Sequence, residues 1–268
     1  MTNRHDWPLT LSVMSNEFTD EWLAAMQQAG IRQMELSIEV LPDHVDMLDY
    51  LNKSVEVRAH AASYGIDISS VHLPYAPFET MDPTTPDPDK REFLFKTVTD
   101  IMKAAAASGI KLAVIHPSGE PYETAERPQR IKDGIDMISR LTAAAKELGM
   151  TLALENLPRL CLCRTHDEMQ AFLEAIPDLR VCFDTNHNLV ESNGEYIRAV
   201  GDKIVTIHVS DYDFINERHW LPMAGKNDWE EILSALEEVG YAGRFLYELR
   251  PGPTPQDVAD NYRQLMAQ

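Results

Sequence analysis

Carboxylates and imidazoles in this sequence recur directly after short apolar runs. In residues 179–190, LRVCFDTNHNLV, an apolar run reaches Phe183 and is followed by Asp184 and, three residues later, by His187. Similar polar residues end the other runs: His72, His116, Glu155 with Asn156, His208 with Asp211, and Glu248 with Arg250. Each of them alone has a structural explanation, since an acidic residue often caps the next helix and a lone histidine is often packed in the core.

The set as a whole indicates a divalent cation. Three carboxylates and at least two imidazoles brought to one place would repel and desolvate one another without a counter-ion. A divalent cation removes this conflict, because it turns like-charged neighbours into ligands. Glu155, Asp184, His208 and Glu248 come one from each of four consecutive apolar runs, which predicts that they share one arc of the site. Mixed carboxylate and imidazole ligation suits Mn²⁺, Zn²⁺, Co²⁺ or Mg²⁺, and the sequence does not choose among them.

Eight apolar runs alternate with longer amphipathic patterns along the chain. The runs cover 9–14, 33–38, 67–75, 112–118, 151–158, 180–187, 204–212 and 244–252. They are rich in Val, Ile and Leu at consecutive positions, which is typical of strands covered on both faces in a parallel sheet. The intervening patterns are typical of helices, with helix starts predicted at residues 19–21 and 227–230.

Eight strand–helix units in about 250 residues predict an α/β fold with a single closed (β/α)8 TIM barrel, forming one domain over residues 1–268. The alternative is a doubly wound open sheet, which more often carries a glycine fingerprint in its first strand-to-helix turn. The sequence contains neither GxGxxG nor a Walker A motif, which favours the barrel. In the sixth run, Val181 and Phe183 are expected to fill the barrel, with Asp184 at its mouth.

The active site of such a barrel lies where the strands end and the following loops begin. The polar residues that end the runs are therefore expected to meet at one face. Residues 76–90, rich in Pro and Asp, are predicted to form a long loop over this face. Four aromatic residues are candidates for the apolar wall of the pocket, with ordinary packing as the alternative: Trp7, Tyr75, Phe78 and Trp220.

Charge and cysteine content exclude some classes of partner and location. The net charge is −19, from 43 acidic and 24 basic residues. This disfavours a nucleic acid backbone and an anionic membrane surface as partners. Three cysteines without a CxxC pair fit a reduced protein, and no apolar stretch has the length of a signal peptide or a membrane span, so a cytoplasmic location is expected. The sequence is also compatible with a homo-oligomer.

Seven motifs in the third to eighth runs and the loops after them carry a family resemblance. They are VHLPY (71–75), VIHPS (114–118), ALEN (153–156), FDTNH (183–187), IHVSD (207–211), ERHWLPMAGKNDW (217–229) and YELR (247–250). Together and in this order they resemble the xylose isomerase-like TIM barrel superfamily. That superfamily includes sugar and sugar-phosphate isomerases and epimerases, inosose-type dehydratases and endonuclease IV-type DNA repair enzymes.

The resemblance to ketose 3-epimerases implies roles for most of the candidate residues. The four residues named above look like the metal ligands, and two of them, Glu155 and Glu248, look like the acid/base pair on opposite faces of the substrate. His187 and Arg218 look like residues that hold substrate hydroxyls. His72 and His116 are expected to contact substrate as well, because sugar enzymes of the superfamily often keep such histidines in the pocket.

The resemblance to the endonuclease IV branch leaves a second metal site open. His72, His116, Glu217 and His219 fall where that branch completes a multi-zinc cluster, so Glu217 and His219 are candidates for additional metal ligands. The acidic charge balance weighs against nucleic acid. One further departure concerns the epimerases, in which a carboxylate a few residues after the first metal glutamate touches substrate. Residues 159–163 supply none.

The expected function is therefore a divalent-metal-dependent sugar or sugar-phosphate isomerase or epimerase. It would act by proton transfer through a metal-stabilised enediolate. The alternatives are a multi-zinc apurinic-site nuclease of the endonuclease IV type, an inosose-type dehydratase, and a barrel that binds without turnover. The expected partner is a small-molecule sugar, and its phosphorylation stays open. Cations in suitable loops are Arg159, Arg218, Lys226 and Arg250, and the sequence shows no dedicated phosphate loop.

Overall fold

Eight parallel strands close into one barrel in chain order, as predicted. The computed structural model describes residues 3–14, 17–38, 47–120 and 124–267, with the backbone alone for 47–54. The strands are β1 (Leu9–Met14), β2 (Gln33–Ser37), β3 (Asp67–His72), β4 (Leu112–Ile115), β5 (Thr151–Glu155), β6 (Arg180–Asp184), β7 (Ile204–Val209) and β8 (Phe245–Tyr247). The pairing of β1 with β8 closes the ring, so the fold is a (β/α)8 TIM barrel.

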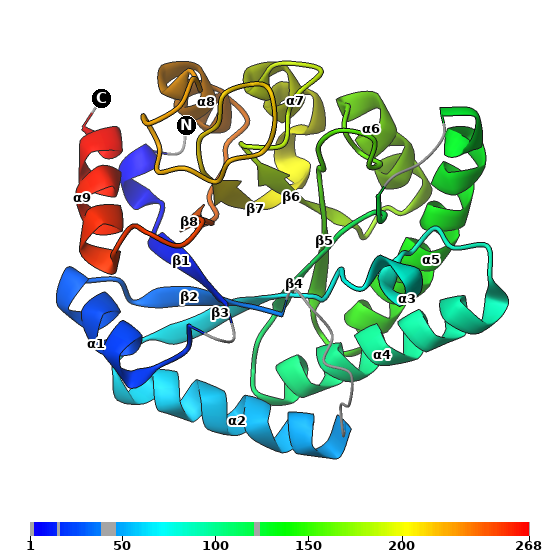
Figure 1. The fold of residues 1–268 in the computed structure, drawn as a ribbon, viewed down its shortest axis with the longest axis horizontal. Coiled ribbons are helices and arrows are strands. Elements are labelled where there is room, and N and C mark those ends of the chain that lie inside the picture. The colour runs from blue at the N-terminus through cyan, green and yellow to red at the C-terminus, as the bar shows by residue number, and fades with distance from the viewer. Residues whose placement is uncertain (1–2, 15–16, 39–46, 121–123, 268) are drawn as a thin grey trace.

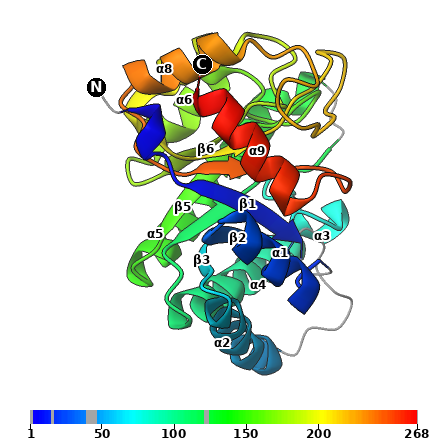
Figure 2. The same ribbon diagram turned by 90° about the vertical axis from the view of Figure 1, so that its left-hand side faces the viewer.

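Helices surround the strands on the outside of the barrel (Figure 1). They are α1 (Asp20–Ala29), α2 (Met47–Ser63), α3 (Phe78–Met81), α4 (Pro88–Ala107), α5 (Arg127–Glu147), α6 (His166–Ala175), α7 (Asn193–Val200), α8 (Trp229–Glu238) and α9 (Pro255–Met266). The last helix, α9, packs beside α1, so the two ends of the helical ring meet (Figure 2). Among the described residues, no helix is both long and apolar enough to cross a membrane.

Side-chain caps start the helices at the predicted places. The Thr19 hydroxyl accepts a hydrogen bond from the backbone N–H of Trp22 at the start of α1, and the Asp228 carboxylate accepts one from Glu231 at the start of α8. Gly30 ends α1 with φ of 84°, a left-handed conformation that glycine adopts without the usual steric penalty. Short loops then lead from each helix to the next strand.

The predicted runs extend beyond several strands at their C-terminal ends. The run 67–75 becomes β3 only as far as His72, and the run 244–252 becomes β8 only over Phe245–Tyr247. The residues left over form the start of the loops at the active face. Residues 76–90 also contain more structure than expected, because they include the short helix α3 and the first turn of α4. This segment is held by an ion pair of 2.9 Å between Asp82 and Arg130 of α5.

Strand β6 corrects one expectation about the core. Side chains two positions apart on a strand point the same way, so Cys182 shares the inward side with Asp184. Phe183 therefore points outward, and its ring lies 5.4 Å from that of Tyr196 in α7. Val181 belongs to the same core between strands and helices. Inside the barrel lies a small apolar cluster instead: Leu112, Val114, Ala153 and Cys182.

Candidate functional site

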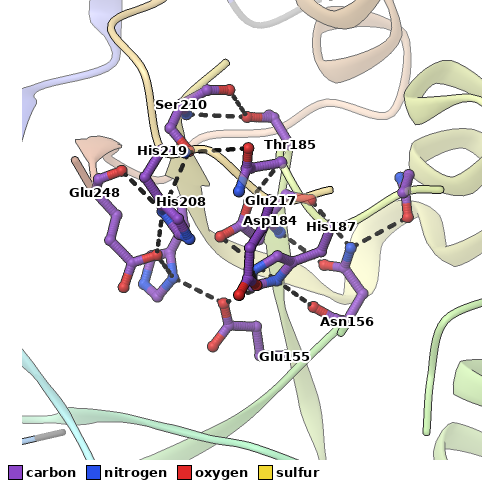
Figure 3. Close-up of polar contacts among 12 residues, drawn as sticks. Glu155, Asn156, Asp184, Thr185, His187, His208, Ser210, Glu217, His219 and Glu248 are labelled. Carbon is purple, nitrogen blue, oxygen red and sulfur yellow. Dashed lines mark hydrogen bonds and ion pairs between the residues drawn. The ribbon is translucent and has the colours of Figure 1, made fainter. Parts of the chain in front are cut away.

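Four acidic and imidazole side chains meet at the C-terminal mouth of the barrel. Glu155 and Asp184 are the last residues of β5 and β6, His208 lies near the end of β7, and Glu248 follows β8 directly. One ligand atom from each of the four lies within 4.8 Å of those of the others. Figure 3 shows these side chains pointing toward one another. The structure thus brings together the four residues that the sequence suggested as metal ligands.

The backbone register and one asparagine hold this arrangement. Asp184 and His208 are direct partners in the pairing of β6 with β7. Asn156, which follows β5, accepts a hydrogen bond of 2.7 Å from the Asp184 N–H and donates one of 3.0 Å to the Asp184 carbonyl oxygen. This side chain continues the strand pairing where β5 has already ended. It therefore fixes the positions of Glu155 and Asp184 relative to each other.

Glu155 lies at the centre of a group of imidazoles. Its Oε2 accepts a hydrogen bond of 3.0 Å from Nε2 of His72 and lies 3.3 Å from Nε2 of His116, while its Oε1 contacts Nδ1 of His208 at 3.0 Å. Burial alone would raise the pKa of Glu155, but the charge of His208 and the three contacts hold the pKa well below its usual range. In turn, burial would lower the pKa of His72, but the hydrogen bond and charge of Glu155 raise it to about 9.

Glu248 has the opposite electrostatic environment. Burial raises its pKa to about 8, helped by repulsion from Glu155 and Asp184 and opposed by the charge of His208. Two carboxyl groups on neighbouring ligand positions therefore differ strongly in proton affinity. Such a separation of pKa values is typical of functional sites.

Asp184 supplies a test of whether a cation fits here. Its Oδ1 accepts a hydrogen bond from the N–H of Asn186, but its Oδ2 is buried and has no hydrogen-bond partner within the described part of the chain. A buried carboxylate oxygen without a partner is costly, by about 1–3 kcal/mol or more. Asp184 is one of the four residues whose ligand atoms converge. Three carboxylates and one imidazole, with one oxygen unsatisfied, fit a divalent cation.

A second set of residues lies on the other side of Asp184. His187 has its Nδ1 3.6 Å from the Asp184 Oδ2, and its Nε2 3.4 Å from Glu217. Asp184, His187 and His219 form a further group whose ligand atoms lie within 4.8 Å of one another, and so do His72, Glu155 and His208. Burial would lower the pKa of His187, but the charge of Asp184 and the contact with Glu217 raise it to about 10.

A cavity of about 450 Å³ opens above these residues. It is lined by Met14, His72, Tyr75, Phe78, His116, Ser118, Glu120, Glu155, Leu157, Pro158, Arg159, Cys161, His187, Glu217, His219, Glu248, Leu249, Arg250 and Pro251. Tyr75 and Phe78 thus belong to the wall, and the Tyr75 ring stacks on His116 at 4.4 Å. Trp7 lies elsewhere, in the core against Phe245. Trp220 lines an adjoining, more open groove.

Two arginines, Arg159 and Arg250, line the cavity, whereas Arg218 lies outside it. Arg218 pairs with Asp213 at 2.8 Å, its guanidinium lies 5.8 Å from the Trp220 ring centroid, and it is not among the described residues that line the cavity. Arg159 makes two hydrogen bonds of 2.7 Å to Glu120 and contacts Glu217 at 3.1 Å. Glu120 and Glu217 also line the cavity, so carboxylates are present there although residues 159–163 supply none.

One charged residue inside the barrel was missed by the sequence analysis. Glu35 of β2 has no exposed surface, and its Oε1 lies 3.1 Å from Nε2 of His208. Its Oε2 accepts a hydrogen bond of 2.8 Å from the Ser70 hydroxyl. The available signal was a glutamate in the middle of an apolar run, QMELSI, rather than at its end. Attention to run ends alone therefore overlooked it.

Comparisons with known proteins agree with this architecture. The sequence model of the xylose isomerase-like TIM barrel family matches residues 23–267. A D-psicose 3-epimerase of Ruminiclostridium cellulolyticum is 25% identical over 241 residues, which cover 85% of this chain and 76% of that protein. A protein named "Probable endonuclease 4" from Acholeplasma laidlawii is 29% identical over 194 residues, or 69% and 62% of the two chains. The solved D-psicose 3-epimerase from Clostridium cellulolyticum H10 superposes with a TM-score of 0.73 at 20% identity, covering 96% of each chain.

Proposed function

The chain belongs to the xylose isomerase-like TIM barrel family, and from this premise and its site we propose that it is a divalent-metal-dependent isomerase or epimerase of a sugar or sugar phosphate. The observation that carries the proposal is the convergence of Glu155, Asp184, His208 and Glu248 within 4.8 Å, beside a cavity that Glu155 and Glu248 line. A cavity of this volume suits a small molecule.

These four residues would hold the ion, which could be Mn²⁺, Zn²⁺, Co²⁺ or Mg²⁺. When bound, the ion supplies Lewis acidity that polarises a substrate carbonyl and stabilises the negative charge that develops on its oxygen. Glu155 and Glu248 approach the cavity from β5 and β8, so they can reach a bound substrate from different sides. One of them removes the proton from the carbon beside the carbonyl.

The fate of that proton decides the reaction. Return of a proton by the other glutamate to the opposite face of the same carbon gives an epimer. Return to the neighbouring carbon gives an isomer, and departure of a neighbouring hydroxyl instead gives a dehydration of the inosose type. The three outcomes share the first step, and the same pair of carboxyl groups serves each as general acid and base.

Cavity-lining residues would orient the substrate. His72, His116 and His187 line the cavity next to the proposed ligands, so we retain them as contacts for substrate hydroxyls. Arg218 would have to leave Asp213 to reach the cavity, and we therefore assign its expected role to Arg159. Arg159 is already paired with carboxylates, which suits hydroxyl recognition and leaves less of its charge for a phosphate.

A second candidate function is a multi-metal phosphoesterase of the endonuclease IV type. The second group, Asp184, His187 and His219, with Glu217 beside it, favours this candidate because it could hold a further ion. Against it stands the net charge of −19, since binding to a DNA backbone normally needs an excess of Lys and Arg. We therefore place it second.

Metal counting combined with an exchange assay separates the candidates. The chelator-treated protein is reloaded with Mn²⁺, Co²⁺, Zn²⁺ or Mg²⁺, and incorporation of deuterium from D₂O into a panel of ketoses and ketose phosphates is followed by NMR. One ion per chain with exchange beside the carbonyl supports the proposal. Several bound zinc ions with cleavage of abasic-site DNA and no exchange would overturn it in favour of the second candidate. Binding without any turnover would leave a sugar-binding barrel.

A further inference from the structure

Glu35 lies behind His208, on the side away from the other proposed ligands. The His208 imidazole has its Nδ1 3.0 Å from Glu155 and 3.4 Å from Glu248, while its Nε2 lies 3.1 Å from Glu35. The ring is thus held between two sets of carboxylates. Its Nδ1 faces Glu155 and Glu248 at the proposed metal site, and its Nε2 faces Glu35 inside the barrel.

The position of Glu35 is built by the strands on both sides of it. Glu35 is aligned with Ser12 of β1 and with Ser70 of β3, and the register of β2 against β3 shifts at Met34–Glu35. The Ser70 hydroxyl donates to Oε2 at 2.8 Å, and the Ser12 hydroxyl lies within 3.5 Å of Oε1. Irregular strand positions of this kind often re-aim a side chain near an active site.

We propose that Glu35 is a positioning residue for the metal centre, whose carboxylate fixes the orientation and tautomer of the ligand His208. The inference rests on the proposed function, because it requires an ion at the Glu155, Asp184, His208 and Glu248 site. A histidine that binds a metal through Nδ1 must carry its proton on Nε2, and a carboxylate acceptor at Nε2 selects that form. Glu35 is the described residue placed to accept it.

The geometry of the contact is consistent with this role. The Nε2 of His208 lies at ion-pair distance from Glu35 but has no aligned hydrogen bond among the described residues. Contacts of this kind in active sites often align fully only in the loaded enzyme. A purely structural role explains the arrangement less well, since a buried charge usually adds less stability than well-packed apolar residues of similar volume. Ser12 and Ser70 restrain the carboxylate in the direction of His208.

Metal affinity tests the proposal without reference to turnover. Full-length protein freed of metal is titrated with Mn²⁺ and Co²⁺ in competition with a chromophoric chelator, for wild type, Glu35→Gln, Ser70→Ala and Thr142→Val. We expect Glu35→Gln to weaken binding by about 10–100-fold, the range for partners of metal-bound histidines. Ser70→Ala keeps the carboxylate but loosens it, so a smaller loss is expected. The visible absorption of bound Co²⁺ should change in Glu35→Gln, because the His208 ligand is reoriented.

Thr142→Val is the matched control for loss of a buried polar contact. Thr142 lies in α5 away from the site, and its buried hydroxyl donates to the Ile138 carbonyl oxygen at 2.7 Å. This variant should lose stability and keep the wild-type affinity and Co²⁺ spectrum. Equal effects of Thr142→Val and Glu35→Gln on affinity would show that the loss reflects general destabilisation, and would overturn the proposal.

The remaining outcomes also decide the question. Wild-type affinity and spectrum in a folded Glu35→Gln overturn the proposal while leaving the proposed function intact. If Glu35→Gln does not fold, Ser70→Ala decides, and an unchanged affinity in that variant counts against Glu35 as well. A wild-type protein that binds none of the ions contradicts the proposed function itself, and the role of Glu35 with it.

Discussion

Replacing Asp184 with asparagine should separate stability from metal binding. The buried Oδ2 of Asp184 has no hydrogen-bond partner in the described part of the chain, while its Oδ1 accepts from the Asn186 N–H. Asparagine keeps the Oδ1 acceptor and places a neutral N–H₂ group close to Glu155, His208 and Glu248. We therefore predict that Asp184→Asn is tolerated without metal and defective with it.

The expected change in Tm follows from the contacts of Asp184 and the length of the chain. Removing an unsatisfied buried oxygen gains about 1–3 kcal/mol, and this is offset by the loss of the 3.6 Å ion pair with His187. An unfolding entropy of about 2.1 cal/mol/K per residue over 268 residues gives a Tm change of about 2 °C per kcal/mol. Without metal, the Tm of Asp184→Asn should therefore equal that of wild type or exceed it by up to about 3 °C.

With metal bound, wild type should have a higher Tm than Asp184→Asn. An ion present at about 100 times its Kd stabilises the folded state by about 2.7 kcal/mol, which corresponds to a rise in Tm of about 5 °C for wild type. Asp184→Asn loses one charged ligand and should show little or no rise. The assay is differential scanning calorimetry of chelator-treated protein, with and without Mn²⁺, at matched ionic strength.

Asp178→Asn is the control for the chemical change. Asp178 precedes β6, at the opposite end of the same strand, and pairs with the exposed Lys146 at 2.6 Å. This variant should keep the full metal-induced rise. The reasoning would be refuted if Asp184→Asn kept the rise in Tm, or if it lost several degrees without metal, because Asp184 would then serve the fold rather than an ion.

Three further outcomes are expected. Glu248→Gln should lower deuterium exchange into a substrate ketose by about 10²–10⁴-fold through loss of a general acid/base, whereas Glu237→Gln, in α8 beside Arg4, should not; substantial residual exchange would remove Glu248 from that role. Gly225→Ala should lower Tm by about 2–5 °C, a cost of about 1–3 kcal/mol, because the added Cβ would lie 2.4 Å from the Tyr212 carbonyl oxygen. An unchanged Tm would mean that the loop between β7 and α8 adjusts freely. Cys161 lines the cavity, but burial raises the pKa of its thiol to about 12. Its alkylation by iodoacetamide at pH 8, followed by mass spectrometry, should therefore be about 10³-fold slower than that of a free cysteine. Rapid labelling of Cys161 in the native protein would contradict this prediction.

The barrel and the four converging ligands could be predicted because both follow from sequence patterns of a few consecutive residues. Each apolar run is long enough to identify a strand, and parallel strands deliver their C-terminal residues to one face. The direction of Phe183 was wrong for an equally local reason. Because Asp184 faces inward and side chains alternate along a strand, its neighbour Phe183 must face outward.

Other parts of the site depend on contacts between distant segments. Arg218 and Arg159 both lie in loops of the active face, and only their partners decide which reaches the cavity: Arg218 is held by Asp213, and Arg159 by Glu120 and Glu217. Arg159 pairs with residues of two other loops, whereas Arg218 and Asp213 share the loop between β7 and α8, and the strand and helix patterns of the sequence reveal neither pairing. Glu35 was hidden for a related reason, because its partner His208 lies on a strand across the barrel.

The proposed ligands and one part of the cavity wall come from different halves of the barrel, which bears on how such an enzyme could diversify. The four proposed ligands all come from β5 to β8, whereas Tyr75, Phe78 and Glu120, which line the cavity, follow β3 and β4. Insertions or exchanges in the loops after β3 and β4 could therefore reshape the pocket without moving any ligand. Changes in these two loops would alter one side of the pocket, while the side formed by Arg159 and His187 stayed as it is.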